Sequence, residues 1–173
     1  GKHHQGTGKR NRATNSGVRR ADVKYGIWLT QTSPVMIEAA AKSGVDWVIL
    51  DLQHGMFDLD SAMCAIQILN LCGVESLARM HYSQIDLMAK LLDFGLDGAI
   101  FASVEDADTV RRLVAATTYM PAGDRSWAGA RFGMGAQRST WAGSSVPVHL
   151  LYETRGAVRD IREIASIPGV SGF

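Results

Sequence analysis

Apolar and polar residues follow one another in blocks along this chain, and each pair of blocks has the length of a strand and a helix. Short, near-continuous apolar runs occupy residues 25–30, 45–51, 74–79, 96–101 and 146–153, and another begins at 167. Such runs are typical of parallel strands buried on both faces. Helical periodicity marks residues 33–44, 59–71, 84–94, 105–117 and 157–165. The pattern predicts an α/β protein in which six strands alternate with five helices around a parallel sheet.

Capping residues support these boundaries. Ser33 fits the N-cap of the first predicted helix, Pro34 its first turn and Gly44 its C-terminal stop. Gly73 and Gly95 stand at the equivalent joins after the next two helices. The same helix–glycine–strand unit is therefore expected three times.

Two parallel architectures fit this alternation: an open doubly wound sheet and a (β/α)8 TIM barrel. No glycine-rich phosphate loop follows the first strand, which weakens the dinucleotide-binding interpretation. A complete barrel typically needs about 250 residues, and this chain has 173. If the fold is a barrel, about six β/α units are present, and we expect two more beyond the C-terminal end.

The charge distribution divides the chain into two parts. Residues 1–20 contain six Lys or Arg and no acid, which leaves twelve basic and seventeen acidic residues in the remainder. We interpret residues 1–22 as a disordered basic arm, because they lack the large apolar side chains that offset ordering entropy. Residues 23–173 form the predicted partial barrel domain. Its mildly acidic balance gives no reason to expect a nucleic-acid partner.

The cysteines and the hydropathy of the chain indicate in which cellular compartment the protein is expected. Cys64 and Cys72 lie in an apolar helical stretch and are interpreted as reduced packing residues. Met36, Met63 and Met88 are likewise expected to fill the core. No apolar run reaches membrane-spanning length. We therefore expect a cytoplasmic protein with no membrane partner.

Polar side chains gather where the predicted strands end. Trp28, Asp51, Arg79 and Glu153 lie in or next to the ends of four strands, and His54 follows Asp51 closely. In parallel α/β folds, ligands bind at the carboxyl ends of the strands. We therefore expect these side chains to share one rim.

Each rim residue has a chemical and a structural interpretation. Asp51 and His54 could form an acid–imidazole pair for proton transfer, or Asp51 could simply cap the next turn. Arg79 could hold a carboxylate or an oxyanion, or form a structural ion pair. Glu153 could bind Mg²⁺ or Mn²⁺, or favour a helix N-terminus. The sequence contains no Cys/His metal cluster and no Gly-x-Ser-x-Gly elbow.

The ordered segments "YGIWLT", "SPVMIEAAAKSGVDWVILDLQHGMFD", "ARM", "MPAGDRS", "YETRGA" and "IPGVSGF" resemble the HpcH/HpaI aldolase family. That family includes 4-hydroxy-2-oxoheptanedioate and 2-keto-3-deoxy-sugar-acid aldolases and macrophomate synthase. The resemblance runs from residue 25 to residue 173. It implies a (β/α)8 barrel and class II aldolase chemistry on 2-oxoacids such as pyruvate, with an aldehyde as second partner. It also implies a divalent metal, Mg²⁺ or Mn²⁺ with Co²⁺ or Zn²⁺ as further candidates, and a homo-oligomer.

The resemblance also implies roles. His54 with its acid partner Asp51 handles protons, and Arg79 contacts the pyruvate carbonyl and the enolate oxygen. Glu153 is one of two carboxylate metal ligands; the other is expected beyond residue 173. Trp28 lies near the active-site floor. Arg125, in the loop after the fourth helix, is a substrate-binding candidate. An acid often stands in the family where this chain has Gln53, although some members carry glutamine.

Two alternatives remain. The chain could be a non-catalytic fragment or degenerate relative that acts through association, since an unclosed sheet exposes its edges. It could also be a citramalyl- or malyl-CoA-type lyase of the same broad family.

Overall fold

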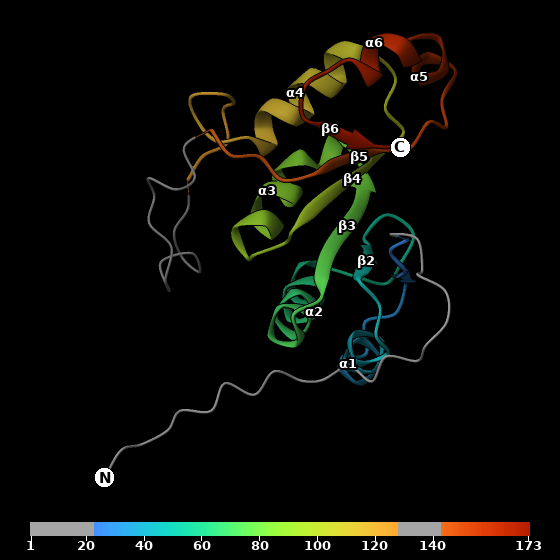
Figure 1. Ribbon diagram of the computed structural model, residues 1–173, viewed down its shortest axis with the longest axis vertical. Helices are drawn as coiled ribbons and strands as arrows, with labels where there is room; N and C mark the ends of the chain where they lie inside the picture. Colours follow the sequence, from blue (N-terminus) through green and yellow to red (C-terminus); the bar gives the residue numbers. More distant parts are fainter. Residues whose placement is uncertain (1–22, 128–142) are drawn as a thin grey trace.

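A computed structural model describes residues 23–127 and 143–173, which form a curved, six-stranded parallel sheet (Figure 1). The strands are β1 (Gly26–Leu29), β2 (Trp47–Asp51), β3 (Glu75–His81), β4 (Gly98–Ala102), β5 (Val148–Leu150) and β6 (Val170–Gly172). They lie side by side in sequence order, and each neighbouring pair is parallel. A doubly wound sheet reverses its strand order at one point, whereas a barrel does not. The structure is therefore six units of a (β/α)8 barrel, as predicted.

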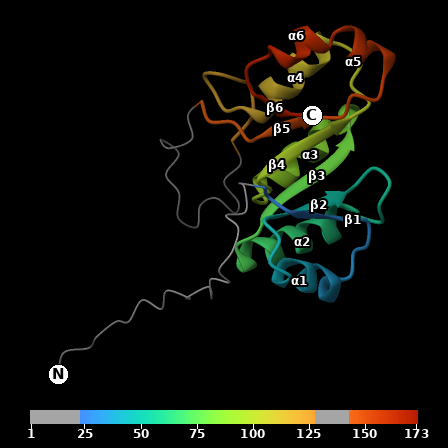
Figure 2. The ribbon, with the colours of Figure 1, turned by 45° about the vertical axis from the view of Figure 1, so that its right-hand side comes forward.

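The helices lie on the outer, convex side of this sheet (Figure 2). They are α1 (Pro34–Lys42), α2 (Leu59–Cys72), α3 (Ile85–Asp93), α4 (Ala107–Thr117), α5 (Arg155–Arg159) and α6 (Ile161–Ala165), with a 3₁₀ turn, η1 (Tyr82–Gln84), before α3. No helix of the described segments covers the inner, concave face. The two faces of the sheet consequently meet different surroundings.

Two hydrophobic clusters correspond to these two faces. The larger cluster lies between the sheet and the helices and includes Leu50 of β2, Met80 of β3 and Phe101 of β4. A smaller cluster on the inner face joins Ile49, Leu77 and Ile100 of β2, β3 and β4. Side chains alternate between the two faces along each strand. Burial on both faces explains why the strands look continuously apolar in the sequence.

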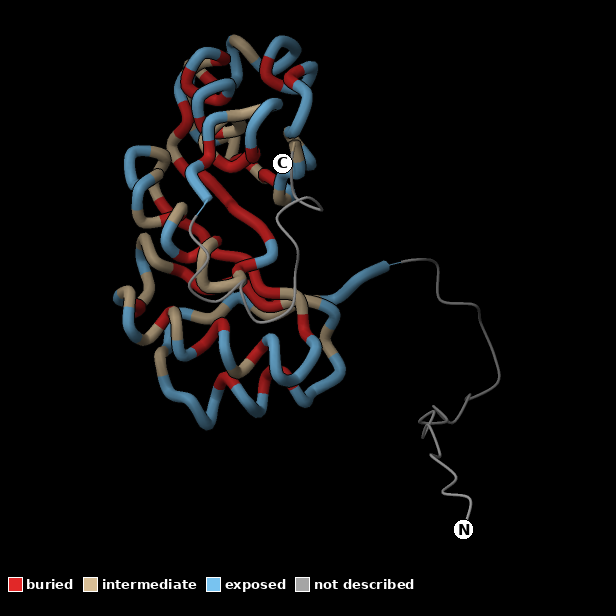
Figure 3. The backbone as a smooth tube through the Cα atoms, turned by 90° about the vertical axis from the view of Figure 1, so that its left-hand side faces the viewer, coloured by how far each residue is buried: buried red, intermediate tan, exposed pale blue. Residues whose placement is uncertain are grey.

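Burial is deepest in the middle of the sheet. All five residues of β4 are buried, and its neighbour β3 is buried at five consecutive positions. Figure 3 shows buried segments along the strands and exposed segments on the outward turns of the helices. The carboxyl ends of β2, β3 and β4 are thus attached to the most rigid part of the molecule.

The predicted helix stops are confirmed. Gly44, Gly73 and Gly95 have φ values of +90°, +68° and +96°, the left-handed region in which glycine is favoured. Ser33 occupies the N-cap of α1 as expected, but its side chain makes no capping hydrogen bond with the described residues. The capping box of α2 is complete, because Asp58 and Ser61 each bond to the other's backbone amide.

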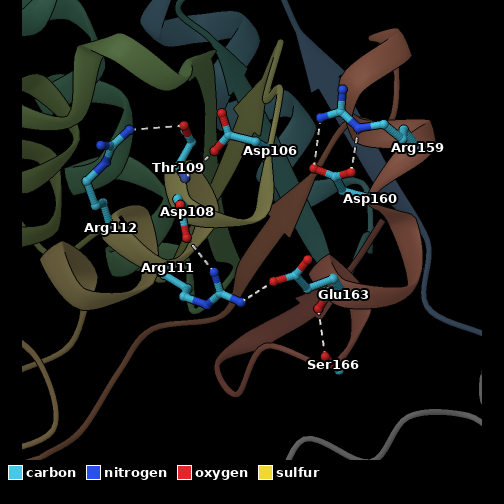
Figure 4. Close-up of polar contacts among 9 residues, drawn as sticks. All are labelled: Asp106, Asp108, Thr109, Arg111, Arg112, Arg159, Asp160, Glu163 and Ser166. Carbon is cyan, nitrogen blue, oxygen red and sulfur yellow. Dashed lines mark hydrogen bonds and ion pairs between the residues drawn. The ribbon is translucent and has the colours of Figure 1, made fainter.

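The prediction of one helix over residues 157–165 is wrong. The chain forms α5 and α6 instead, and Asp160 stands between them with φ −96° and ψ 12°. Its carboxylate accepts hydrogen bonds from Nε and Nη2 of Arg159 at 2.7 and 3.0 Å (Figure 4). On the adjacent helix α4, Arg111 binds both Asp108 and Glu163, which ties α4 to α6.

Two packing predictions are also wrong. Cys64 and Cys72 are free thiols, but both are exposed on the outer surface of α2. Met36 is 56% exposed, although Met88 is fully buried as expected. An apolar helical stretch carries more apolar residues than its buried stripe can accept, so composition alone does not identify the buried ones.

The predicted basic arm at residues 1–22 lies outside the described residues, as do residues 128–142 in the loop after the fourth helix. Within the described part of the chain, no helix is long and apolar enough to cross a membrane.

Candidate active site

Five of the six predicted site residues lie at the rim formed by the carboxyl ends of the strands. Asp51 ends β2, and its register partner across the sheet is Arg79 of β3. Trp28 lies in β1, and His54 follows β2 by three residues. Glu153 reaches the same edge from the loop after β5.

Asp51 is the centre of the polar contacts at this rim and is only 2% exposed. Its Oδ2 accepts hydrogen bonds from the Trp28 indole at 3.1 Å and from Nη2 of Arg79 at 2.7 Å. Its Oδ1 accepts the backbone amides of Gln53 and His54 at 3.0 and 2.9 Å. Asp51 therefore holds together the ends of three strands and the turn that follows β2.

Burial and hydrogen bonding act in opposite directions on the charge state of Asp51. Burial by itself raises the pKa of this carboxyl, but the His54 amide, the Trp28 indole and the Arg79 guanidinium stabilise the charged form. Their combined effect is larger, so the pKa lies below its ordinary value. An ionised carboxylate with four donors is an anchor for its neighbours and a poor proton acceptor.

The sequence left two interpretations of Asp51 open, a side-chain pair with His54 or a cap of the following turn. Asp51 binds the backbone amide of His54, and the imidazole is exposed at the rim. The structural interpretation of Asp51, as the cap of the following turn, is the one that the structure shows. His54 lies three residues after Asp51 in the sequence, and it is exposed.

Arg79 is held on two sides. Nη2 binds Asp51, and Nη1 donates to the side-chain oxygen of Gln53 at 2.7 Å. The guanidinium carbon lies 5.5 Å from the centre of the Trp28 ring, within the range of a cation–π contact. Arg79 is 8% exposed, and its buried Nε has no hydrogen-bond partner among the described residues. The guanidinium is thus fixed in place while one of its buried donors remains unpaired.

Glu153 lies three residues beyond β5 and is exposed. Its Oε1 accepts the backbone amide of Ser103 at 2.7 Å and the Ser103 hydroxyl at 3.1 Å. Both of these donors bind Oε1, and Oε2 accepts no hydrogen bond from the described residues.

The hydrogen bonds at each carboxylate indicate which oxygens could bind a divalent cation. A carboxylate oxygen free of protein donors, as in Oε2 of Glu153, is a suitable ligand for a hard cation. Asp51 is unsuitable, because four donors already occupy its oxygens. Within residues 23–127 and 143–173, no three His, Cys, Asp or Glu side chains form a group that could hold an ion. The described residues thus offer one suitable metal ligand at this rim, the Glu153 carboxylate.

Arg125 is not brought to this rim. Its Nη2 binds Asp93, the last residue of α3, at 3.1 Å, and its guanidinium lies 4.3 Å from the Tyr119 ring centre. The end of α3 leads into the start of β4, so this contact lies at the amino edge of the sheet. Arg125 is 6% exposed, and its contacts are those of a structural ion pair.

A cavity of about 400 Å³ extends along the inner face of the sheet, and its walls include Trp28, Trp47 and Leu77. His149 and Glu75 also line it. Burial lowers the pKa of the His149 imidazole, and the nearby Glu75 carboxylate opposes this effect. Trp28 connects this apolar cavity to the polar rim, since its indole N–H binds Asp51.

Comparison with known proteins identifies the family. The model of the HpcH/HpaI aldolase/citrate lyase family matches residues 24–173. The chain belongs to this family. The resemblance noted in the sequence is thereby confirmed.

Individual members agree with this assignment. A 2-dehydro-3,6-dideoxy-6-sulfogluconate aldolase of Pseudomonas putida is 29% identical over 160 residues, covering 90% of this chain and 63% of the relative. A hydroxypyruvate/pyruvate aldolase of Sagittula stellata is 30% identical over 161 residues, covering 91% and 64%. The chain therefore spans less than two thirds of the length of these curated relatives.

A solved structure gives the same result for the fold. An HpcH/HpaI aldolase/citrate lyase family protein from Burkholderia cenocepacia superposes with a TM-score of 0.77 at 28% identity. The matched region covers 85% of this chain and 61% of that one.

Sequence reasoning missed two residues of this HpcH/HpaI-family rim. Gln53 was noted as a departure from the family pattern but not as the second partner of Arg79. Ser103 follows β4 directly and was not given a role, although it binds Glu153. Its place after a strand was the available signal; its contact with a residue fifty positions away was not readable from one sequence.

Proposed function

We propose that the protein is a divalent-metal-dependent class II aldolase that cleaves or forms 4-hydroxy-2-oxoacids through a pyruvate enolate. The family assignment supports aldolase chemistry, and both curated relatives described above are named as aldolases. The substrate class, the metal and the direction of the reaction are the proposal.

The observation that carries the proposal is the state of Arg79. Its charge is buried, its orientation is fixed by Asp51 and Gln53, and its Nε lacks a partner among the described residues. A buried unpaired donor costs about 1–3 kcal/mol. An anionic oxygen bound there removes that cost and gains a charge-assisted hydrogen bond. The enolate oxygen of a 2-oxoacid is such an anion.

The reaction needs a proton acceptor, a stabilised enolate and a proton donor. Cleavage removes the proton of the C4 hydroxyl, breaks the C3–C4 bond and releases an aldehyde. The pyruvate enolate that remains takes up a proton at C3. Arg79 stabilises the negative charge on the enolate oxygen. The exposed imidazole of His54, beside the anchored Asp51, exchanges protons at the rim.

The proposed metal site uses Glu153. Oε2 of this side chain would hold a divalent ion, Mg²⁺ or Mn²⁺ with Co²⁺ or Zn²⁺ as further candidates. When bound, the ion supplies Lewis-acid stabilisation of developing negative charge, worth several kcal/mol. Ser103 keeps the other oxygen of Glu153 occupied, so the carboxylate presents one oxygen outward.

The test is a pyruvate-release assay. The protein at its natural length is incubated with Mn²⁺ and a panel of 4-hydroxy-2-oxoacids, and pyruvate is measured enzymatically. We expect pyruvate from at least one compound, and a loss of about 10²-fold or more in Arg79→Lys, which keeps the charge but not the forked geometry.

Two outcomes contradict the proposal. Turnover in Arg79→Lys equal to that of the unaltered protein would remove Arg79 from the site. Cleavage of malyl- or citramalyl-CoA to acetyl-CoA, with no pyruvate released from any free 4-hydroxy-2-oxoacid, would favour the lyase alternative. Thermal unfolding of both proteins serves as the control for folding.

A further inference from the structure

Ser103 combines an uncommon backbone conformation with two hydrogen bonds to one oxygen. It follows β4 directly and has φ +61°, and within the described residues it is the one non-glycine residue with positive φ. Serine rarely adopts this left-handed region, because Cβ approaches the neighbouring carbonyl oxygen. With this conformation, the amide and the hydroxyl of Ser103 both reach Oε1 of Glu153.

A second contact joins the same two loops without involving Glu153. The Thr154 hydroxyl donates to the backbone oxygen of Val104 at 2.6 Å, and it also caps α5 by accepting the amide of Ala157 at 3.0 Å. The loops after β4 and β5 are therefore already joined next to Ser103. The unusual conformation of Ser103 is not needed to hold the loops together, so its specific effect falls on the Glu153 carboxylate.

We propose that Ser103 is the positioning residue of Glu153. It fixes Oε1 with two donors and thereby orients Oε2 outward as the oxygen that binds a divalent cation. This inference rests on the proposed role of Glu153 as a metal ligand. Strained residues persist at sites where the geometry serves function, and Ser103, directly after β4, binds Glu153 at the rim.

The experiment compares Mn²⁺ binding with stability in matched variants of the protein at its natural length. Ser103→Ala and Ser103→Gly both remove the hydroxyl, but only glycine accepts φ +61° without strain. Thr154→Val removes the neighbouring loop contact and leaves the Ser103–Glu153 bonds in place. Mn²⁺ alone is titrated by calorimetry, and thermal unfolding is recorded for each protein without metal.

We expect Mn²⁺ affinity to fall about fivefold in both Ser103 variants, the effect of one lost hydrogen bond. We also expect Ser103→Gly to unfold at a higher temperature than Ser103→Ala, and Thr154→Val to lose thermal stability with unchanged Mn²⁺ affinity. The Mn²⁺ affinity would then depend on the Ser103 hydroxyl and not on the thermal stability of the variant.

Three results would overturn the proposal. The first is wild-type Mn²⁺ affinity in Ser103→Ala, and the second is an equal loss of affinity in Thr154→Val. The third is unchanged Mn²⁺ binding in Glu153→Gln, which would remove Glu153 as a ligand. Only the third result also contradicts the proposed metal site, so the two failures can be told apart.

Discussion

Asp51 and Arg79 form a buried ion pair in which each charge compensates the other. Their side chains are 3% and 10% exposed, and the ion pair between them measures 2.7 Å. An unpaired buried charge is strongly unfavourable, so removal of one partner affects the fold as well as the site. Asp51 is consequently better described as the support of Arg79 than as a participant in proton transfer.

This dependence predicts the effect of Asp51→Asn. We expect a loss of about 3 kcal/mol in unfolding free energy at pH 7, because Arg79 keeps its burial and loses its counter-charge. The pKa of Asp51 is lowered by folding. Its contribution to stability is therefore fully present above the unfolded pKa of about 3.9 and is lost as pH falls through the folded pKa. Urea unfolding from pH 7 to pH 3 should show the difference between the two proteins narrow below about pH 4. A constant difference across this range would contradict the account.

Gln53 influences the same guanidinium through a neutral contact. Its amide oxygen accepts from Nη1 of Arg79, so Asp51 supplies the one carboxylate in contact with this cation among the described residues. In Gln53→Glu a second carboxylate would neutralise Arg79 further and weaken its attraction for an anion. We expect KM for the 2-oxoacid to rise about fivefold, or about 1 kcal/mol. Gln53→Met, which removes the contact without adding charge, is the control; an unchanged KM in Gln53→Glu would refute the argument.

His54 differs from these residues because its side chain is exposed. Its backbone amide, and not its imidazole, donates the hydrogen bond to Asp51. His54→Ala is therefore expected to fold normally and to lower turnover by about 10² to 10⁴-fold, the usual effect of a positioned acid–base group. Steady-state kinetics and thermal unfolding of the same preparation check both parts. A variant that loses activity and folded signal together would indicate a structural histidine.

Among the elements, the strands and helix ends were the most predictable features. Gly73 shows why: its φ of +68° closes α2, and a position that requires this conformation strongly favours glycine. The break at Asp160 was not predictable, because neither proline nor glycine marks it and the sequence around it is a good helix former. The exposure of Cys64 was missed for a related reason, since helix α2 is apolar on more than one side.

The helix stop at Gly73 can be tested directly. A Cβ added there would meet no atom within 4 Å, so Gly73→Ala introduces backbone strain without a steric clash. We expect a loss of about 1–2 kcal/mol in unfolding free energy, the cost of the left-handed conformation for alanine. Leu71→Ala, at an 88% exposed position of the same helix, should change stability by less than about 0.5 kcal/mol. Equal effects of the two substitutions in urea unfolding would contradict this interpretation of Gly73.

For the whole molecule, the site could be located from topology but not described in detail. Parallel strands place their carboxyl ends on one edge, so Trp28, Asp51 and Arg79 were expected to meet, and they do. The choice of hydrogen-bond partners depends on side-chain geometry that periodicity does not encode. The sequence thus could not decide whether Asp51 binds the His54 imidazole or its amide, and it did not indicate that Arg125 lies at the opposite edge.

The proposed aldol chemistry depends on a divalent cation held at Glu153. The most direct measurement is pyruvate release from a 4-hydroxy-2-oxoacid by the protein at its natural length and by its Glu153→Gln variant, each assayed with excess EDTA and again after Mn²⁺ is restored. The account predicts that EDTA abolishes the activity of the unaltered protein, that Mn²⁺ restores it, and that Glu153→Gln is inactive under both conditions while remaining folded. Activity that persists in EDTA and is abolished by borohydride in the presence of substrate would indicate Schiff-base catalysis and would contradict the account.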